Sequence, residues 1–293
     1  MESVGEAVVG GAVTVVNAIP TGKGAALGVA LRTSSRVQLS KGDGVVKFLS
    51  AEEIGDDKVV RATVETVLER AGLRGYDCVV EVRSEIPVAV GLKSSSSAAS
   101  AVAFALFDAL DLDPSAEEAL DLIVEASLKS GTSITGAADD ASACFMGGFV
   151  VTDNTARTLL KREEVTGDLV AIVSIPRGKR VFTGEFRREA LTPFRDLFET
   201  AFELAVRGDL FRAMTLNGLS MAAALGYGTG LIVEALRKGA YSCTISGTGP
   251  AVVALAKKVD FEGVVEVMST YGDVRVVEVN NEPVRFGGRR LKL

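Results

Sequence analysis

The sequence Pro87-Val-Ala-Val-Gly-Leu-Lys-Ser-Ser-Ser-Ser-Ala-Ala99 leads from a loop into an Ala-rich helix that we expect over residues 94–110. The first N–H groups of a helix have no partners inside it, and the helix dipole makes that end positive, so it can bind a phosphate. Serine is also a preferred N-cap residue, which would make this segment a capped, buried helix. One serine is enough for a cap, whereas four in a row are weak helix formers. Phosphate binding and capping both remain open at this point.

A second segment, Ser246-Gly-Thr-Gly-Pro-Ala251, lies between two apolar stretches that we expect to be strands. Gly247 and Gly249 permit positive φ angles and a close backbone approach to a ligand. Pro250 removes an N–H donor and fixes the direction of the chain. A tight hairpin turn is the simpler interpretation of this segment, and a ligand-binding loop is the alternative.

A third segment, Gly136-Ala-Ala-Asp-Asp-Ala141, carries two adjacent carboxylates among small residues that leave room for a ligand. Aspartate is a preferred N-cap residue, so Asp139 or Asp140 could equally well cap a helix that begins here. The sequence alone therefore indicates either half of a ligand site or the start of a helix.

A fourth segment, Asn17-Ala-Ile-Pro-Thr-Gly-Lys-Gly24, joins two expected strands. It is not a P-loop, because the pattern GxxxxGK[ST] requires Gly in place of Asn17 and Ser or Thr in place of Gly24. Lys23 lies between two glycines, where it could reach an anion or be a solvated turn lysine.

The composition restricts the chemistry that is available to the protein. The chain has 293 residues, none of which is histidine, and its formal net charge is −6. Without histidine there can be no Ser-His-Asp triad, no Cys-His dyad and no His-ligated metal site. Proton transfer must therefore use Asp, Glu, Lys, Tyr, Cys or water. The net acidity argues against a general nucleic-acid partner.

The cysteines and the apolar runs indicate where the protein works. Cys78, Cys144 and Cys243 lie far apart and form no CxxC pair, so we expect them to be core residues in a reducing cytoplasm. The N-terminus lacks the features of a signal peptide. The longest clean apolar run, Ala101–Phe107, is far too short to span a bilayer. We therefore expect a cytoplasmic protein without a membrane partner, and no feature of the sequence specifies an oligomeric state.

Strands and helices are mixed without regular alternation, which predicts an α+β fold rather than a doubly wound parallel sheet. We expect four strands separated by turns within residues 5–50, at 12–19, 25–33, 36–40 and 45–49. The other expected helices are at 58–71, 116–129 and 261–271, with several more within 195–239, and the other expected strands are at 76–84, 147–152, 169–175 and 274–279 and on both sides of the 246–251 turn. Residues 153–167 are polar, carry charges of both signs and are the candidate domain boundary.

The order of these motifs along the chain resembles the GHMP kinases, a superfamily that includes galactokinase, homoserine kinase, mevalonate kinase and phosphomevalonate kinase. The matching elements are P-x3-G-L-x-S-S at residues 87–95, Asp140 followed by Gly147-Gly148, and S-G-x-G-P at residues 246–250. The resemblance extends from about residue 5 to about residue 280.

Within that superfamily the chain resembles the archaeal shikimate kinases in three stretches: TVVNAIPTGKGAALGV from residue 14, GLKSSSSAA from residue 91 and LKSGTSITGAADDA from residue 128. Lys93 replaces the Gly that is common in the wider superfamily, as is typical of the archaeal shikimate form. Two positions depart from the pattern. Ser97 replaces a usual Ala, and Lys129 occupies a position that often holds a Mg²⁺-binding Glu, so the resemblance does not supply a second protein ligand for Mg²⁺.

The resemblance implies a two-domain α+β fold. Residues 1–155 would form an N-terminal ATP-binding domain with a βαβ unit, and residues 156–293 would form a C-terminal ferredoxin-like domain. It further implies ATP- and Mg²⁺-dependent phosphorylation of the 3-hydroxyl of shikimate, on the way to chorismate and the aromatic amino acids. The alternatives are another GHMP small-molecule kinase, which acts on homoserine or a mevalonate-pathway alcohol, and a catalytically inactive relative that senses a ligand. A dinucleotide-binding oxidoreductase is disfavoured because the GxGxxG fingerprint is missing.

The resemblance also implies the roles of individual residues. Asp140 would accept the proton of the attacking hydroxyl or orient it, with Asp139 as its nearest competitor. Mg²⁺ and either Lys23 or Lys129 would offset the repulsion between the carboxylate and ATP. Ser95 would bind Mg²⁺, with Ser94 and Ser96 as the alternatives. The residues expected to bind ATP are Pro87, Val88, Ala89, Val90, Gly91, Leu92, Lys93, Ser94, Ser95, Ser96 and Ser97. Those expected to bind the acceptor are Asn17, Thr21, Lys23, Asp140, Arg177, Gly247, Thr248 and Gly249. The candidate partners of the acceptor's carboxylate are the cations Lys23, Arg177, Lys179 and Arg180.

Overall fold

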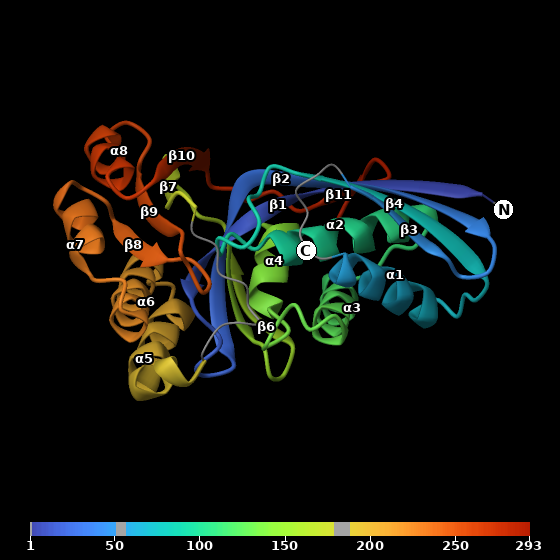
Figure 1. Ribbon diagram of the computed structural model, residues 1–293, viewed down its shortest axis with the longest axis horizontal. Coiled ribbons are helices and arrows are strands. Elements are labelled where there is room, and N and C mark those ends of the chain that lie inside the picture. Colours follow the sequence, from blue (N-terminus) through green and yellow to red (C-terminus); the bar gives the residue numbers. More distant parts are fainter. Residues whose placement is uncertain (1, 51–56, 179–187) are drawn as a thin grey trace.

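The structure is a computed structural model that describes residues 2–50, 57–178 and 188–293. Within these residues, eight strands form the larger of two sheets, and helices cover one of its faces (Figure 1). The strands are β1 (Ser3–Val16), β2 (Lys23–Lys41), β3 (Val46–Ser50), β4 (Tyr76–Ser84), β5 (Phe149–Asp153), β6 (Thr158–Glu163), β11 (Arg285–Phe286) and β12 (Arg289–Arg290). The main path through this sheet is β12-β11-β1-β2-β4-β3, and β5 pairs with both β2 and β6.

The long hairpin of β1 and β2 is the frame of this sheet. Its register runs from Ser3 opposite Leu39 to Val16 opposite Ala25. The expectation of two separate strands at 25–33 and 36–40 is wrong, because β2 continues through Ser34 and Ser35 without a turn. These residues stay in the strand because they are paired on both sides, with β1 and with β4.

A βαβ unit forms the far edge of the sheet, as expected. β3 and β4 pair in parallel, and α1 (Lys58–Arg70) makes the crossover between them. The same face of the sheet is covered by α2 (Ser94–Ala109), α3 (Ala116–Lys129) and α4 (Ala138–Met146) (Figure 1). The start of a helix near Asp139 and Asp140, one of the two alternatives for this segment, is confirmed by α4. The sequence pattern did not indicate how far α4 extends, because every residue of α4 is buried and the helix has no polar face and no helical period.

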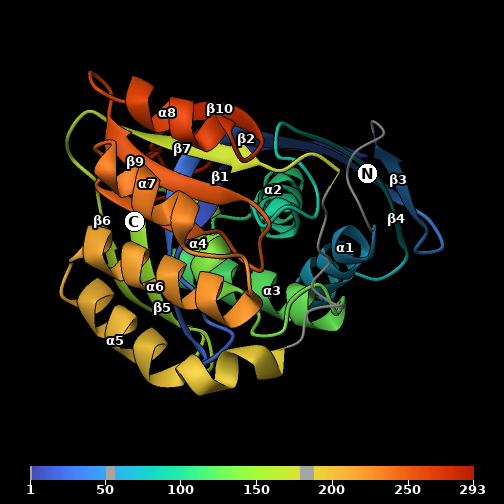
Figure 2. The ribbon, with the colours of Figure 1, turned by 60° about the vertical axis from the view of Figure 1, so that its left-hand side comes forward.

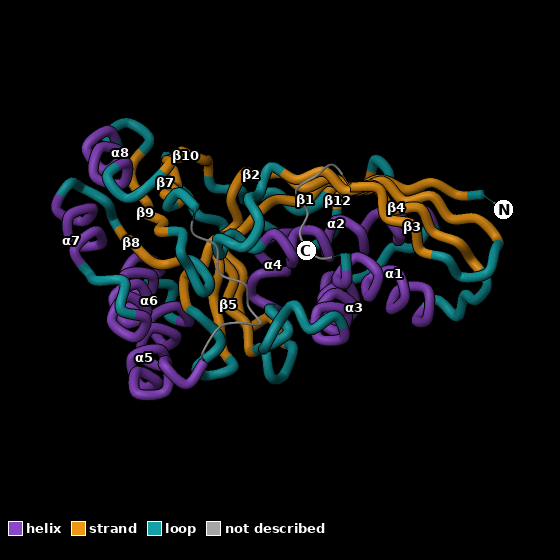
Figure 3. The backbone as a smooth tube through the Cα atoms, viewed as in Figure 1, coloured by secondary structure: helices purple, strands orange, loops and turns teal. Residues whose placement is uncertain are grey.

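The second sheet consists of four antiparallel strands in the order β10-β7-β9-β8. Its elements are β7 (Leu169–Ile175), η2 (Arg188–Phe194), α5 (Arg195–Val206), α6 (Leu210–Leu225), α7 (Gly230–Arg237), β8 (Ser242–Ile245), β9 (Val252–Lys257), α8 (Glu262–Ser269) and β10 (Asp273–Glu278). Helices lie between β7 and β8 and between β9 and β10, so this is the strand-helix-strand-strand-helix-strand order of a ferredoxin-like unit. The expected α+β fold with a ferredoxin-like C-terminal half is confirmed. Figure 2 shows α5 and α6 side by side, and Figure 3 shows the strands of the two sheets next to each other in the middle of the molecule.

Strand β7 of the second sheet is buried on both faces. Val170 and Ile172 of β7 belong to the core beneath the helices of this half, whereas Ala171 and Val173 belong to a core shared with β1 and β2. Burial on both faces explains why β7 is a nearly continuous apolar run rather than an alternating one.

After β10 the chain returns to the first sheet, where β11 pairs with β1. Phe286 is 1% exposed, and its ring centroid lies 5.1 Å from that of Phe104 in α2. The division into domains after residue 155 remains a prediction. In the structure, β5 and β6 on either side of it belong to one sheet, and the chain passes to the second sheet between residues 163 and 169.

Cys78, Cys144 and Cys243 are buried free thiols, as expected. In the part of the chain that the structure describes, no helix is long and apolar enough to cross a membrane.

We predict that Phe286→Ala lowers the free energy of unfolding by about 3–5 kcal/mol, as is typical when a buried aromatic ring is removed. Urea unfolding would measure the loss. Val259→Ala is the control, because Val259 is 77% exposed and its removal leaves no cavity. Equal stability of the two variants would show that the returning segment does not complete the core.

Candidate functional site

A cavity of about 370 Å³ lies where the N-termini of α2 and α4 meet the turn between β8 and β9. It is lined mostly by hydroxyl and charged groups. The polar side chains around it belong to Asn17, Lys58, Lys93, Ser94, Ser95, Ser96, Ser127, Ser130, Thr132, Ser133, Thr135, Asp139, Asp140 and Thr248. Apolar walls come from Ile19, Val59, Val88, Ala98 and Ile134. The cavity therefore joins three of the four segments that the sequence singled out and the beginning of the fourth.

The N-terminus of α2 is open toward this cavity. Its N-cap residue is Lys93, with φ 64° and ψ 32°, and no side chain caps the helix. The N–H groups of Ser94, Ser95 and Ser96 have no acceptor among the described residues. The capping interpretation of the four serines is therefore wrong. The fourth, Ser97, points away from the cavity and donates to the carbonyl of Gly10 at 3.0 Å. Three free N–H groups at a positive helix end suit an anion.

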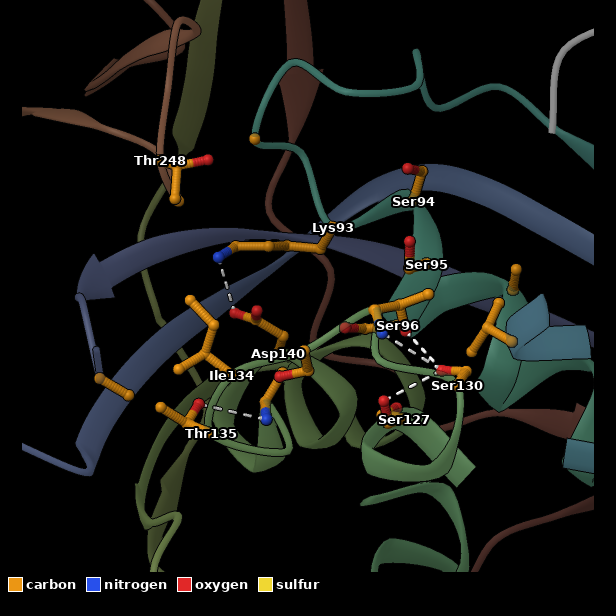
Figure 4. Close-up of a pocket in the computed structure, with 18 of the residues that line it drawn as sticks. Lys93, Ser94, Ser95, Ser96, Ser127, Ser130, Ile134, Thr135, Asp140 and Thr248 are labelled. Atoms are coloured by element: carbon orange, nitrogen blue, oxygen red, sulfur yellow. Dashed lines mark hydrogen bonds and ion pairs between the residues drawn. The ribbon is translucent and has the colours of Figure 1, made fainter. Parts of the chain in front are cut away.

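Lys93 reaches across the cavity to Asp140, as Figure 4 shows. Its Nζ lies 2.9 Å from Oδ1 of Asp140, and the two side chains are only 10% and 12% exposed. No hydrogen-bond donor among the described residues is aligned with this Oδ1, so the contact is an ion pair. A left-handed backbone costs a non-glycine residue of order 1 kcal/mol. In this conformation, Lys93 faces both the base candidate and the open helix end.

Asp139 and Asp140 lie in the first turn of α4, and the N-cap is Ala137 rather than either aspartate. Asp139 is buried, and it accepts a hydrogen bond from Nδ2 of Asn154 at 2.8 Å. Its other oxygen lies so close to β2 that a Cβ on Gly24 would be 2.5 Å from it. Burial raises the pKa of Asp139 to about 7, and the charge of Asp140 adds to this effect, while Lys93 and Asn154 oppose it.

The turn between β8 and β9 is the expected hairpin, and it also forms one wall of the cavity. A Cβ on Gly91 would lie 2.1 Å from the carbonyl oxygen of Ser246. The loop of residues 85–93 that precedes α2, called the α2 loop below, is therefore in backbone contact with this turn. The hydroxyl of Ser246 donates to the carbonyl of Gly91 at 2.8 Å. Nδ2 of Asn17 donates to the carbonyl of Gly247 at 2.9 Å. Hence the prediction of a turn is confirmed, and ligand binding by this turn stays a prediction.

The structure does not bring all the expected site residues to the cavity. Those that line it are Val88, Ala89, Gly91, Lys93, Ser94, Ser95 and Ser96 from the ATP set and Asn17, Asp140, Gly247 and Thr248 from the acceptor set. Those that do not are Pro87, Val90, Leu92 and Ser97, and Thr21, Lys23, Arg177 and Gly249. Val90 and Leu92 are buried in the core that the two halves share.

The expected cations lie elsewhere. Lys23 is exposed, and its Nζ is 5.7 Å from the ring centroid of Phe202 in α5. Thr21 closes the turn before β2 by accepting from the N–H of Lys23. Arg177 is exposed and forms an ion pair with Asp273 at 2.9 Å. Lys179 and Arg180 lie outside the described residues. The roles of Lys23 and Arg177 toward an acceptor therefore stay predictions without geometric support.

The segment between α3 and α4 forms a wall of the cavity that was not predicted from the sequence. Ser127, Ser130, Thr132 and Thr135 line the cavity there, and Lys58 lines it at the start of α1. The signal was present in the stretch LKSGTSITGAADDA, where hydroxyl residues recur every one or two positions between Ser130 and Thr135. Lys129 in the same stretch points away, with its Nζ 2.9 Å from Glu69 of α1.

Two archaeal relatives are similar to this chain over almost its whole length. The family described as GHMP kinases N terminal domain matches residues 58–148. The shikimate kinase of Methanothrix thermoacetophila is 44% identical over 279 residues, which are 94% of each chain. That of Methanococcoides burtonii is 39% identical over 96% of this chain and 98% of the relative. The chain belongs to the shikimate kinase family of GHMP kinases.

Solved structures of other GHMP kinases have the same fold. A homoserine kinase from Cytophaga hutchinsonii superposes with a TM-score of 0.75 at 21% identity, over 98% of each chain. The L. major mevalonate kinase, solved in complex with R-mevalonate, has a TM-score of 0.71 at 16% identity over 94% of this chain and 95% of that one. Identities this low show a common fold and do not specify an acceptor.

We predict that the stability of Asp139→Asn rises relative to wild type as the pH increases from about 5 to about 8. The pKa near 7 in the folded protein exceeds the unfolded value of about 3.9. Between these values the folded protein holds a proton that the unfolded chain has released, so wild type loses stability as the pH rises. Asparagine cannot ionise and does not have this loss.

Urea unfolding of both proteins at the two pH values measures this difference. Asp168→Asn removes an exposed carboxylate and is the control for the change in net charge. Parallel pH dependences of wild type and Asp139→Asn would contradict the assignment of a buried, proton-binding carboxyl.

Proposed function

We propose that this protein is a shikimate kinase, which transfers the γ-phosphoryl group of ATP to the 3-hydroxyl of shikimate. The proposal is supported by named relatives at up to 44% identity over nearly the whole chain. ATP as the donor follows from membership in the GHMP kinases. The three buried free thiols suit the reducing cytoplasm in which we propose that it works.

One observation supports a phosphoryl-transfer site most directly: the buried Lys93–Asp140 pair adjoins three unpaired N–H groups at the start of α2. Phosphoryl transfer depends on alignment and on charge stabilisation more than on covalent help from the protein. The helix end offers an anion site, and the pair offers an acceptor for a proton and a cation beside it. A catalytically inactive relative would have no need to keep all three.

The phosphate side of the proposed reaction belongs to the α2 loop. The N–H groups of Ser94, Ser95 and Ser96 would hold the β- and γ-phosphates, with the helix dipole adding to the attraction. Positive φ angles at Ala89, Gly91 and Lys93 shape the loop that leads to them. Val59, Val88 and Ile134 form the apolar part of the same cavity.

The residues present fit a Mg²⁺ ion that arrives with ATP. In the described ranges, no group of three or more acidic or cysteine side chains could hold a metal ion. Mg²⁺ in such enzymes is held largely by substrate phosphates and water, so a few protein oxygens are sufficient. The exposed hydroxyl of Ser95 lines the cavity and would be the protein ligand. When bound, Mg²⁺ neutralises charge on the phosphates.

Asp140 would act on the acceptor. The acceptor oxygen forms a bond to the γ-phosphorus, the bond from that phosphorus to the β–γ bridging oxygen breaks, and the hydroxyl proton passes to the Asp140 carboxylate. Lys93 keeps a positive charge beside this carboxylate and within reach of the transferred group. Gly247 and Thr248 line the opposite wall, where the acceptor would lie (Figure 4).

A coupled assay of ADP release tests the proposal against a panel of alcohols. We expect turnover of shikimate and no turnover of homoserine or mevalonate. Asp140→Ala is the matched control. It should lower kcat by roughly 10²–10⁴-fold, the usual contribution of a positioned base, while ATP still binds. Phosphorylation of homoserine or mevalonate but not shikimate would overturn the substrate assignment.

A second comparison separates the two lysines. Lys93→Met should lower kcat by about 10²-fold, since it removes a preorganised charge from the reacting centre. Lys23 is expected from the family resemblance to bind the acceptor's carboxylate, in which case Lys23→Met should raise the KM for shikimate more than the KM for ATP. Unchanged KM values in Lys23→Met would remove Lys23 from the site and leave the activity assignment intact.

A further inference from the structure

The side chain of Asn217 lies beneath the cavity without lining it. This residue of α6 is fully buried, with 0% exposure. A Cβ on its neighbour Gly218 would lie 2.4 Å from the carbonyl oxygen of Cys243, so the backbone of α6 rests directly on β8. A polar side chain is seldom buried this completely unless its hydrogen bonds are made. The burial of an amide at this position therefore requires its own explanation.

Both ends of the Asn217 amide are used, and each binds a different element. Its Oδ1 accepts from the N–H of Asn17 at 2.8 Å, directly after β1. Its Nδ2 donates to Oγ1 of Thr244 in β8 at 2.8 Å. Asn217 thus connects the helix, a strand of the second sheet and the end of a strand of the first sheet.

The chain of hydrogen bonds continues from Asn17 into the cavity wall. Nδ2 of Asn17 donates to the carbonyl of Gly247 at 2.9 Å, and the N–H of Gly247 donates to Oγ1 of Thr14 at 2.8 Å. The peptide groups on both sides of Gly247 are therefore fixed from the β1 side. Thr248, the next residue, faces the phosphate loop across the cavity.

We propose that Asn217 is a positioning residue that sets the place of the 246–251 turn, through Asn17, for phosphoryl transfer. This proposal rests on the kinase function proposed above. Asn217 touches neither substrate, and its effect is to hold Gly247 and Thr248 at a fixed distance from the α2 loop. Misplacement of about 1 Å at such a wall can cost about 10²-fold in rate.

Hydrogen exchange of the turn tests the positioning without any assay of activity. In Asn217→Ala, amides of residues 246–251 should exchange faster than in wild type, because the acceptor for the N–H of Asn17 is gone. Ser220→Ala is the matched control. It removes a buried hydroxyl of the same helix that donates, among the residues that the structure describes, only to the carbonyl of Leu216, and it should leave exchange of the turn unchanged. Wild-type exchange of the turn in Asn217→Ala would overturn the proposal.

Steady-state kinetics test the consequence. Asn217→Ala should lose tens of fold to about 10²-fold in kcat, while its KM for ATP stays close to wild type. A double variant with Asn17→Ala should lose little more than the larger single loss, because both residues act through one chain of bonds. Losses that multiply in full would show that Asn217 and Asn17 act independently of each other, and would also overturn the proposal.

A milder pair of variants covers the case in which Asn217→Ala does not fold. Thr244→Val removes the acceptor for Nδ2 of Asn217, whereas Thr244→Ser keeps it. Only the valine variant should show the faster exchange and the lower kcat. Equal behaviour of the two would count against the proposal. If wild type itself does not turn over shikimate, the kinase proposal fails, while the exchange experiment still decides the role of Asn217.

Discussion

The contact between Gly91 and Ser246 determines how the site is assembled. A side chain on Gly91 is impossible there, because its Cβ would lie 2.1 Å from the carbonyl oxygen of Ser246. The loop before α2 belongs to the first half of the chain and the 246–251 turn to the second, so this contact joins the two halves at the cavity. The hydroxyl of Ser246 strengthens the contact by donating to the carbonyl of Gly91. Two walls of the cavity are therefore in direct backbone contact.

The charges in the cavity have a cost that the fold compensates in part. The adjacent carboxylates of Asp139 and Asp140 lie with Lys93 in a site with little solvent. Burial disfavours the ionised form of a carboxyl. Burial accordingly raises the pKa of Asp139. The ammonium of Lys93 lies beside Asp140. Helices α2 and α4 both begin at this cavity, and their dipoles add positive potential there. Such a concentration of buried charge lowers stability and gives the cavity a strong local field.

Local sequence patterns were sufficient to predict the helices and strands that have one buried face and one exposed face. The polar and apolar positions of α3 and β4 predict the bounds that the structure has, Ala116–Lys129 and Tyr76–Ser84. The extent of α4 and the existence of the β11–β12 pair were not predicted, for opposite reasons. α4 is buried on every side and has no polar face, whereas β11 and β12 have two residues each and exist only through pairing with distant strands.

The candidate site was likewise predictable only where it depends on local sequence. The order of motifs was enough to indicate Asp140, the serines and the 246–251 turn. The Lys93–Asp140 pair and the bonds of Asn217 join residues that are far apart in the chain, and spacing alone carries no information about such distances. Lys23 is the reverse case: its neighbours in sequence resemble a family motif, yet its side chain lies over Phe202 and outside the cavity.

The return of residues 285–290 to β1 has a consequence for the synthesis of the protein on the ribosome. β1 is made before its neighbour β11, which emerges roughly 15–60 seconds later at typical translation rates of about 5–20 residues per second. Until then this edge of β1 has no partner strand, and unpaired edges are sites of intermolecular association. The first sheet is therefore complete only after residues 285–290 have been translated.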